Sequence, residues 1–207
     1  MSTGTEFDRG LLGGQCWLEL ADGKRLRLPV DRWRTASDPG DELLLRRCKG
    51  PTLDVGCGPG RLTAALSERG IATLGIDCSG VAVHLTQQRG AVALRRNVFD
   101  PIPGEGRWRH VLLADGNIGI GGDPVVLLRR VARLLSGSGS VVVELEAPGR
   151  GIRSEHVRVS GHSTGGEWFP WAWLGVDAVA DVAGEAGLHV GWTGTHGERW
   201  FAELERA

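Results

Sequence analysis

The chain has 207 residues, with 24 lysines and arginines against 25 aspartates and glutamates, and a formal net charge of −1. This length suits one domain with a full hydrophobic core. The balanced charge argues against a nucleic-acid or anionic membrane partner, and no apolar run approaches the length of a membrane span.

The first fifty residues predict a small cap in front of the main domain. Residues 1–10 are polar, and we expect them to be frayed. Residues 16–20 and 25–30 alternate apolar and polar around Asp22-Gly23, which predicts a β-hairpin. The sequence DELLLRRC at 41–48 predicts a short helix. We therefore interpret 1–50 as an N-terminal cap and 51–207 as the main domain. Trp33 and Arg34 could line a substrate pocket. In the alternative, Trp33 packs in an apolar contact and Arg34 faces solvent.

The segment 51–62, PTLDVGCGPGRL, predicts a strand, a glycine turn and a helix. Three glycines (Gly56, Gly58, Gly60) follow a short apolar run that contains Asp54. Because glycine has no Cβ, such a turn allows a small molecule to lie against bare backbone. About twenty residues later, a second apolar run ends in Asp77, whose carboxylate can accept hydrogen bonds from ribose hydroxyls.

Beyond this segment, predicted strands and helices alternate, which is typical of a doubly wound α/β sheet. Ser79 can cap a helix over 81–89, Asp123-Pro124 can start another, and residues 136–139 can end it. Residues 149–166 are rich in glycine and polar residues, and we expect a loop. The closing segments 188–195 and 199–204 predict an antiparallel hairpin through 196–198.

The glycine pattern separates two nucleotide-binding families. A dinucleotide fingerprint, G-x-G-x-x-G, would need glycine where Arg61 stands. The sequence LDVGCGPGRL instead resembles motif I of the class I S-adenosylmethionine-dependent methyltransferases, and GIDCSG at 75–80 resembles their second motif. The resemblance covers roughly residues 50–147 well. It implies a seven-stranded, mostly parallel doubly wound sheet with an antiparallel C-terminal hairpin, and S-adenosylmethionine as cofactor.

The resemblance also implies a set of cofactor contacts. Asp54 and the loop amides would hold the methionyl end, although Asp54 could instead only tie down the loop. Asp77 would bind the ribose. The family carries an acid for adenine at the end of the third strand, where Asn97 stands here, with Asp100 as the alternative. The full set of expected cofactor residues is Asp54, Gly56, Cys57, Gly58, Gly60, Asp77, Cys78, Asn97, Val98 and Asp115.

Deprotonating a hydroxyl acceptor needs a general base, whereas an amine only needs to arrive neutral. The candidates near the predicted cleft are Asp115, His156, His162 and Glu167, of which we name Asp115 and His162 as catalytic. Asp115 could instead contact the methionyl amine or brace the loop at 119–122, and each histidine could be an ordinary surface residue. The histidine spacing fits no standard zinc site, so no metal is expected.

The four cysteines (Cys16, Cys48, Cys57, Cys78) form no C-x-x-C pair, and no signal peptide is recognised, which favours a reducing cytoplasm. Cys57 and Cys78 are expected near the cofactor as small buried side chains rather than nucleophiles.

The tryptophans at 168, 171 and 173 bear on the acceptor. Trp171 and Trp173 would share one face of a strand, where flat aromatic surface suits a planar or cationic molecule. Core packing or a homodimer interface are the alternatives, and the oligomeric state does not follow from the sequence. The predicted function is methyl transfer to an oxygen or nitrogen of a small metabolite. The alternatives are a methyltransferase for protein or nucleic acid, a nicotinamide-dependent oxidoreductase, and a non-catalytic nucleotide-binding module.

Overall fold

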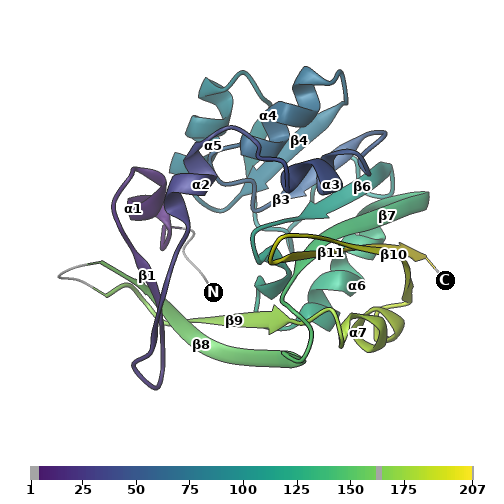
Figure 1. The fold of residues 1–207 in the computed structure, drawn as a ribbon. Coiled ribbons are helices and arrows are strands. Elements are labelled where there is room, and N and C mark those ends of the chain that lie inside the picture. The colour runs from purple at the N-terminus through teal and green to yellow at the C-terminus, as the bar shows by residue number, and fades with distance from the viewer. Residues whose placement is uncertain (1–4, 162–164, 207) are drawn as a thin grey trace.

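The computed structural model describes residues 5–161 and 165–206, which form two β-sheets and the helices around the larger one (Figure 1). The helices are α1 (Asp8–Leu11), α2 (Val30–Arg34), α3 (Asp41–Leu45), α4 (Arg61–Glu68), α5 (Gly80–Gln88), the 3₁₀ helix η1 (Asn117–Gly119), α6 (Pro124–Leu134) and α7 (Val179–Glu185). The strands are β1 (Trp17–Leu20), β2 (Arg25–Arg27), β3 (Thr52–Val55), β4 (Thr73–Asp77), β5 (Ala93–Arg95), β6 (Trp108–Leu113), β7 (Leu135–Leu145), β8 (Ile152–Ser160), β9 (Phe169–Leu174), β10 (Leu188–His196) and β11 (Arg199–Arg206).

The large sheet has the strand order β10-β11-β7-β6-β3-β4-β5. Strands β3 to β7 within it run parallel, whereas β11 pairs antiparallel with both β7 and β10. The strand order reverses direction at β3, so the carboxyl ends of β3 and β6 border the crevice where open α/β sheets bind ligands. The predicted seven-stranded sheet with its C-terminal hairpin is confirmed.

Helices cover both faces of this sheet, and the side chains of β6 show why. Val111 and Leu113 point to one face, where they pack in a core with residues of α6 and α7. Leu112 points to the other face and packs with residues of α3 and α4. All three are completely buried. A central strand covered on both faces therefore has a continuous apolar sequence.

A second sheet, with the order β2-β1-β8-β9, stands beside the large one (Figure 1). The predicted hairpin of β1 and β2 is confirmed, with Leu18 opposite Leu26. On its other side β1 pairs antiparallel with β8, so the N-terminal segment and residues 152–174 build one sheet. The division of the chain at residue 50 stays a prediction.

Three local expectations were wrong. Residues 8–10 are not frayed but belong to α1, which the Ser79 hydroxyl anchors by donating a hydrogen bond to Asp8. Residues 152–160 of the expected loop at 149–166 are strand β8, because their backbone pairs with β1 and β9. Residues 136–139 do not separate helix from strand, since β7 begins at Leu135, directly after α6.

Candidate active site

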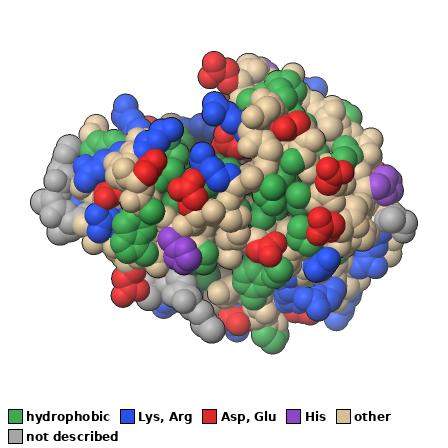
Figure 2. Space-filling view, turned by 90° about the horizontal axis from the view of Figure 1, so that it is seen from below, with side chains coloured by type: hydrophobic (Ala, Val, Ile, Leu, Met, Phe, Trp, Pro, Cys, Tyr) green, Lys and Arg blue, Asp and Glu red, His purple; other side chains and the backbone are tan. Residues whose placement is uncertain are grey.

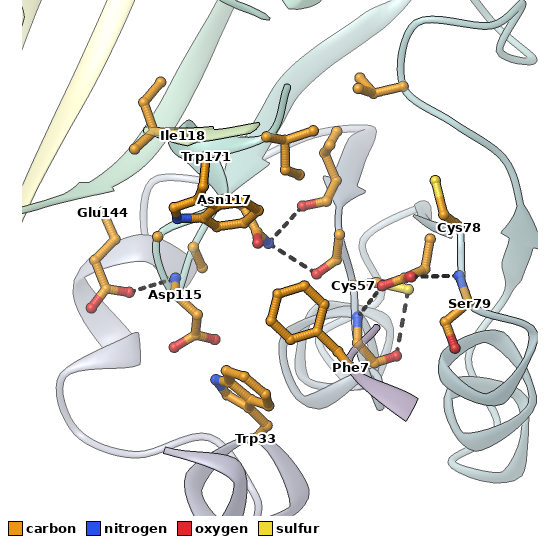
Figure 3. A pocket seen from close by; sticks show the side chains of 18 of the residues that line it. Phe7, Trp33, Cys57, Cys78, Ser79, Asp115, Asn117, Ile118, Glu144 and Trp171 are labelled. Atoms are coloured by element: carbon orange, nitrogen blue, oxygen red, sulfur yellow. Dashed lines mark hydrogen bonds between the residues drawn. The ribbon is translucent and has the colours of Figure 1, made fainter. Parts of the chain in front are cut away.

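A cavity of about 700 Å³ opens at the carboxyl ends of β3, β4 and β6. Its floor is the glycine loop after β3 and the turns after β4 and β6, and its roof comes from α1, α2 and the second sheet. Ligand cavities for small molecules span roughly 300–1,000 Å³. This cavity is therefore large enough for a cofactor with a small second molecule beside it (Figure 3).

The glycine loop after β3 presents bare backbone to this cavity. Gly58 has a φ of +53°, which favours glycine, and a Cβ added there would meet only a methyl group of Leu11 at 4.0 Å. Leu11 itself lines the cavity, so the missing Cβ of Gly58 points into open space that a ligand could fill.

Asn117, from the turn after β6, braces this loop. Its amide nitrogen donates to the carbonyl oxygens of Val55 and Gly56, both at 2.9 Å (Figure 3). A Cβ on Gly56 would lie 2.7 Å from that nitrogen, so the contact requires glycine.

Gly60 does not line the cavity, unlike the other residues expected to bind the cofactor. A Cβ on Gly60 would collide with Thr86 of α5, including its Cα at 2.8 Å. The Thr86 hydroxyl also donates to the carbonyl oxygen of Gly58 at 2.9 Å. Gly60 therefore serves the close packing of α4 against α5.

The Asp77 carboxylate is fixed at the end of β4 by two backbone donors. The N–H of Gly58 donates to one oxygen at 3.0 Å and the N–H of Ser79 to the other at 2.8 Å. Burial raises the pKa of Asp77, while these two N–H groups oppose the rise. Each carboxylate oxygen can accept a further bond, so the group is oriented for a diol.

Asp54, within β3, is buried and accepts a hydrogen bond from the Thr63 hydroxyl at 2.6 Å. Burial raises the pKa of Asp54 to about 6, against the effect of Thr63 and of the nearby Arg61. The negative charges of Asp115 and Asp77 add to the rise. The carboxylates of Asp77 and Asp115 therefore lie close enough to Asp54, around the glycine loop, to raise its pKa.

Asn97 and Val98 line the cavity after β5, as expected for residues at the adenine end. The Asn97 side-chain oxygen accepts the Phe99 N–H at 3.0 Å, which leaves it one further lone pair. Val98 is buried, and its carbonyl accepts from Arg130 at 2.8 Å. The alternative, Asp100, is exposed and is not among the residues that line the cavity.

Asp115 follows β6 and has a φ of +53°, an unusual value for a residue with a side chain. The Asp115 N–H donates to Glu144 at 2.9 Å, and Arg61 donates to its Oδ2. A nitrogen of Arg32 lies 3.2 Å from Oδ1, yet that oxygen accepts no hydrogen bond of good geometry from the described residues. Burial raises the pKa of Asp115, opposed by Arg61.

Asp115 belongs to a network of buried and half-buried ion pairs at the edge of the cavity. Its members are Arg32, Arg61, Arg199, Asp38, Asp41, Asp115 and Glu144. Asp41 is fully buried; burial alone would raise its pKa, but the hydrogen bond from Arg61 and the other partners hold it below the usual value. Three arginines face four carboxylates, so these groups have one negative charge in excess.

The other candidate bases do not meet in the cavity. His156 is exposed on β8 and Glu167 is exposed before β9; neither is among the cavity-lining residues. His162 lies outside the described residues. Within 5–161 and 165–206, no cluster of three or more metal-ligating side chains is found.

The two cysteines near the loop differ in placement. Cys57 is buried against Thr86, and Cys78 is half-buried, with its thiol 3.8 Å from the Arg96 carbonyl. Burial raises the pKa of both thiols, so both stay protonated near neutral pH.

Aromatic rings form the opposite wall of the cavity. Phe169, Trp171 and Trp173 lie on the cavity face of β9, as the spacing of the tryptophans predicts, while Trp168 is exposed beside Arg158. Phe7 contacts three rings, at centroid distances of 5.9 Å to Phe169, 6.0 Å to Trp171 and 6.1 Å to Trp33.

Among the lining residues that the sequence analysis did not single out, five bear on the geometry or charge of the site. Arg61 lies within the first motif, and its position as the first residue of α4 was the available signal. Asn117 lies in the turn after β6, where no motif was recognised. Phe7, Arg32 and Glu144 reach the cavity only through tertiary packing. Trp33 lines the cavity, whereas the exposed Arg34 does not.

Comparisons with known proteins agree with this geometry. Residues 53–143 match a family described as a methyltransferase domain. An S-adenosylmethionine-dependent methyltransferase from Bacteroides fragilis, solved with S-adenosyl-L-homocysteine, superposes with a TM-score of 0.80 at 21% identity, covering 99% of this chain and 94% of that one.

Two further solved structures are similar in fold. The 1,6-didemethyltoxoflavin-N1-methyltransferase of Burkholderia thailandensis has a TM-score of 0.62 at 17% identity, with 82% of this chain and 77% of that one covered. The sugar N-methyltransferase KedS8 from a Streptoalloteichus species has a TM-score of 0.59 at 16% identity, with 80% and 85% covered.

Proposed function

We propose that this chain, whose residues 53–143 match a methyltransferase domain and whose fold is that of the class I methyltransferases, transfers a methyl group from S-adenosylmethionine to an oxygen or nitrogen of a small metabolite. The observation that carries this proposal is the charge around the glycine loop. Asp54, Asp77 and Asp115 lie at the carboxyl ends of three neighbouring strands, and all three line one cavity. Carboxylates favour a cationic ligand, such as one with a sulfonium and an ammonium group.

The residues of the cavity fit this cofactor. Gly58 leaves bare backbone on which a nucleoside can rest. The oriented carboxylate of Asp77 would accept hydrogen bonds from the ribose hydroxyls, and Asn97 with Val98 would border the adenine. When bound, S-adenosylmethionine supplies an activated methyl group for in-line displacement.

The work of this chain is then to orient the acceptor and exclude water. Proximity and orientation can lower a barrier by on the order of 7–11 kcal/mol. The roof of α1, α2 and the second sheet encloses the reacting groups, and the aromatic wall presents an apolar surface to the acceptor.

Asp115 is our candidate for taking a proton from a hydroxyl acceptor. It lines the cavity, and burial raises its pKa, which makes the carboxylate a stronger base. Its contact with Arg61 orients the side chain. His162, which lies outside the described residues, stays a second candidate.

A small acceptor fits better than a macromolecule. The acceptor side of the cavity lies under a roof built from three separate segments, so a polymer has restricted access to it. Nucleic-acid binding would require basic side chains gathered on one surface. On the face drawn in Figure 2, acidic and basic side chains are instead interspersed. No helix of the described residues is long and apolar enough to cross a membrane. A cytoplasmic location and any homodimer stay predictions.

Nicotinamide cofactors fit poorly with the negative charge around the glycine loop. Their pyrophosphate would lie at the start of α4, where Asp54, Asp77 and Asp115 would repel it. A thermal-shift experiment separates the possibilities. Stabilisation by S-adenosylhomocysteine and S-adenosylmethionine, without stabilisation by NAD or NADP, is expected. Stabilisation by the dinucleotides alone would refute the proposal, and no shift with any of the four would favour a non-catalytic module.

A further inference from the structure

The strand order of the large sheet divides the cavity into two halves. In the proposed function, the adenine, the ribose and the methionyl group of the cofactor lie at the carboxyl ends of β5, β4 and β3, in that order. The sheet continues with β6 and β7, and residues that end or follow these strands also line the cavity. Neighbouring strands lie about 4.8 Å apart, so β6 and β7 extend the floor by roughly 10 Å beyond β3. This acceptor half of the cavity is bordered by Asp115 and by Glu144, Leu145 and Glu146.

Glu146, directly after β7, brings a carboxylate to the acceptor half. Its N–H donates to the carbonyl oxygen of Leu174 at 2.8 Å, and its carbonyl oxygen accepts the N–H of Val176 at 3.1 Å. A bridge to Gly175 continues β7 to this residue, and side chains alternate along a strand, so Glu146 points to the same side as Glu144. The Glu146 side chain is exposed and forms no hydrogen bond or ion pair within residues 5–161 and 165–206. Its backbone is therefore fixed, while its carboxylate can accept a ligand.

The nearby arginines do not neutralise this carboxylate. Arg32 and Arg61 line the cavity, but both belong to the network in which three arginines face four carboxylates. Arg96 follows β5, at the opposite edge of the sheet. Arg153, on β8, pairs with Glu155 at 3.2 Å. The network and the Glu146 carboxylate together have two negative charges in excess.

Aromatic rings line the same half of the cavity. Trp171 and Trp173 lie on β9, whose last residue, Leu174, accepts the hydrogen bond from Glu146. The face of an aromatic ring attracts a cation, and Trp173 already holds the guanidinium carbon of Arg153 at 4.1 Å from its ring centroid. Among the residues that the structure describes, no group of three or more metal-ligating side chains occurs. An organic cation therefore fits this half better than a metal ion.

We propose that the methyl acceptor carries a positively charged amine, which the carboxylate of Glu146 binds in the acceptor half of the cavity. The aromatic side chains of β9 cover the apolar part of the molecule. This inference rests on the proposed function, because it places the acceptor beside the cofactor.

Three probes of similar size test the charge of the acceptor. At neutral pH benzylamine is a cation, benzyl alcohol is neutral and benzoate is an anion. The binding of each is measured by titration calorimetry to the protein saturated with S-adenosylhomocysteine. Benzylamine is expected to bind about three- to thirtyfold more tightly than benzyl alcohol, as for one exposed ion pair with one cation–π contact. Benzoate is expected to bind more weakly than benzyl alcohol, because the excess negative charge repels it.

Glu146→Gln keeps the size of the side chain and removes its charge. It is expected to weaken benzylamine binding about two- to fivefold, as for an exposed ion pair, and to leave benzyl alcohol binding unchanged. Glu185→Gln is the matched control, since Glu185 at the end of α7 is also exposed but does not line the cavity. Both variants have the same net charge, so only the position of the lost carboxylate differs. The control should change neither affinity.

The outcomes are distinguishable. A benzylamine affinity no higher than that of benzyl alcohol or benzoate would overturn the cationic acceptor, as would an absence of benzylamine binding. Equal affinities of Glu146→Gln and Glu185→Gln for benzylamine would overturn the role of Glu146. Each of these results leaves the proposed function standing if S-adenosylhomocysteine still binds. Failure of S-adenosylhomocysteine to bind would overturn the proposed function and this inference with it.

Discussion

Replacing Gly58 by alanine tests whether the glycine loop is the floor of the cofactor site. Gly58 has a φ of +53°, and an added Cβ would have no neighbour closer than 4.0 Å. The left-handed conformation costs an L-residue roughly 1–2 kcal/mol, and the stiffer unfolded chain offsets about 0.4–1 kcal/mol of this. The net loss of about 1 kcal/mol corresponds to a fall in Tm of roughly 2–4 °C for a chain of this size.

The effect on the cofactor is expected to be larger than the effect on folding. The new methyl group would project into the cavity beneath Leu11, where we propose that the nucleoside binds. Forcing one extra carbon into a packed contact costs roughly 1–3 kcal/mol. The affinity for S-adenosylhomocysteine should therefore fall roughly 5- to 150-fold.

Gly90→Ala provides the matched control. Gly90 has a φ of +78° and nothing within 4 Å of an added Cβ, and it lies after α5, outside the cavity. It should show the same fall in Tm by scanning calorimetry, with unchanged affinity in titration calorimetry. Wild-type affinity in Gly58→Ala, or an equal loss of affinity in both variants, would refute the placement of the cofactor on this loop.

Three further perturbations test the same site. Asp77→Ala should weaken S-adenosylhomocysteine binding roughly tenfold to a hundredfold, as for one charge-assisted hydrogen bond. In the same calorimetric titration, it should have little effect on the binding of a 2′,3′-dideoxy analogue. Equal losses of affinity for both ligands would refute the contact between Asp77 and the ribose. Burial raises the pKa of Asp54 to about 6, and a cationic ligand favours the ionised carboxylate, so the affinity for S-adenosylmethionine should rise about tenfold from pH 5 to 7. Asp54→Asn should abolish this rise. An affinity of the wild type that does not change with pH would contradict the prediction. Without ligand, the same raised pKa means that the native state holds this proton more tightly than the unfolded chain, so the contribution of Asp54 to stability falls as the pH rises from about 4 to 6. Asn117→Ala removes both hydrogen bonds to the loop. It should lower the free energy of unfolding by about 1–2 kcal/mol and Tm by roughly 2–8 °C. An unchanged melting curve would show that these hydrogen bonds do not stabilise the fold.

The parts of the fold that the sequence predicts well rest on local signals. Ser79 accepts the N–H of Ala82 at 3.0 Å, and Asp123 accepts the N–H of Val126 at 3.1 Å, so both predicted helix caps are confirmed. The hairpin of β10 and β11 turns at Gly197, whose φ of +59° suits glycine. Each of these features is decided within a few residues of chain.

The parts that the sequence does not predict depend on distant partners. Strand β8 is largely polar, and it becomes a strand because its residues 157–160 pair with β1, more than 130 residues earlier, and its residues 152–157 pair with β9. Helix α1 has four residues, too few to be stable alone. Its place is set by the contact of Asp8 with Ser79 and by the rings around Phe7. Propensity and periodicity contain no information on such contacts.

Arg61 contributes both to the stability of the fold and to the geometry of the candidate site. In the sequence it is the residue that breaks the dinucleotide fingerprint. In the structure its buried guanidinium contacts Asp41 on one side and Asp115 on the other. A glycine at this position would leave Asp41 buried with fewer partners, which is strongly destabilising, and would release Asp115 from its fixed orientation.

Arg61 also limits the negative charge of the network, because it is one of three arginines that face four carboxylates. Arg61, Arg32 and Arg199 together compensate three of the four carboxylates in the network, and Asp115 is the one that lacks a good partner on one oxygen. Asp115 and Glu144 both line the cavity, so part of the negative charge of the network lies at the cavity surface. A bound cation can balance it, whereas a pyrophosphate would add to the repulsion. The residue that breaks the dinucleotide pattern thus also holds Asp115, one of the carboxylates that would face the proposed sulfonium cofactor.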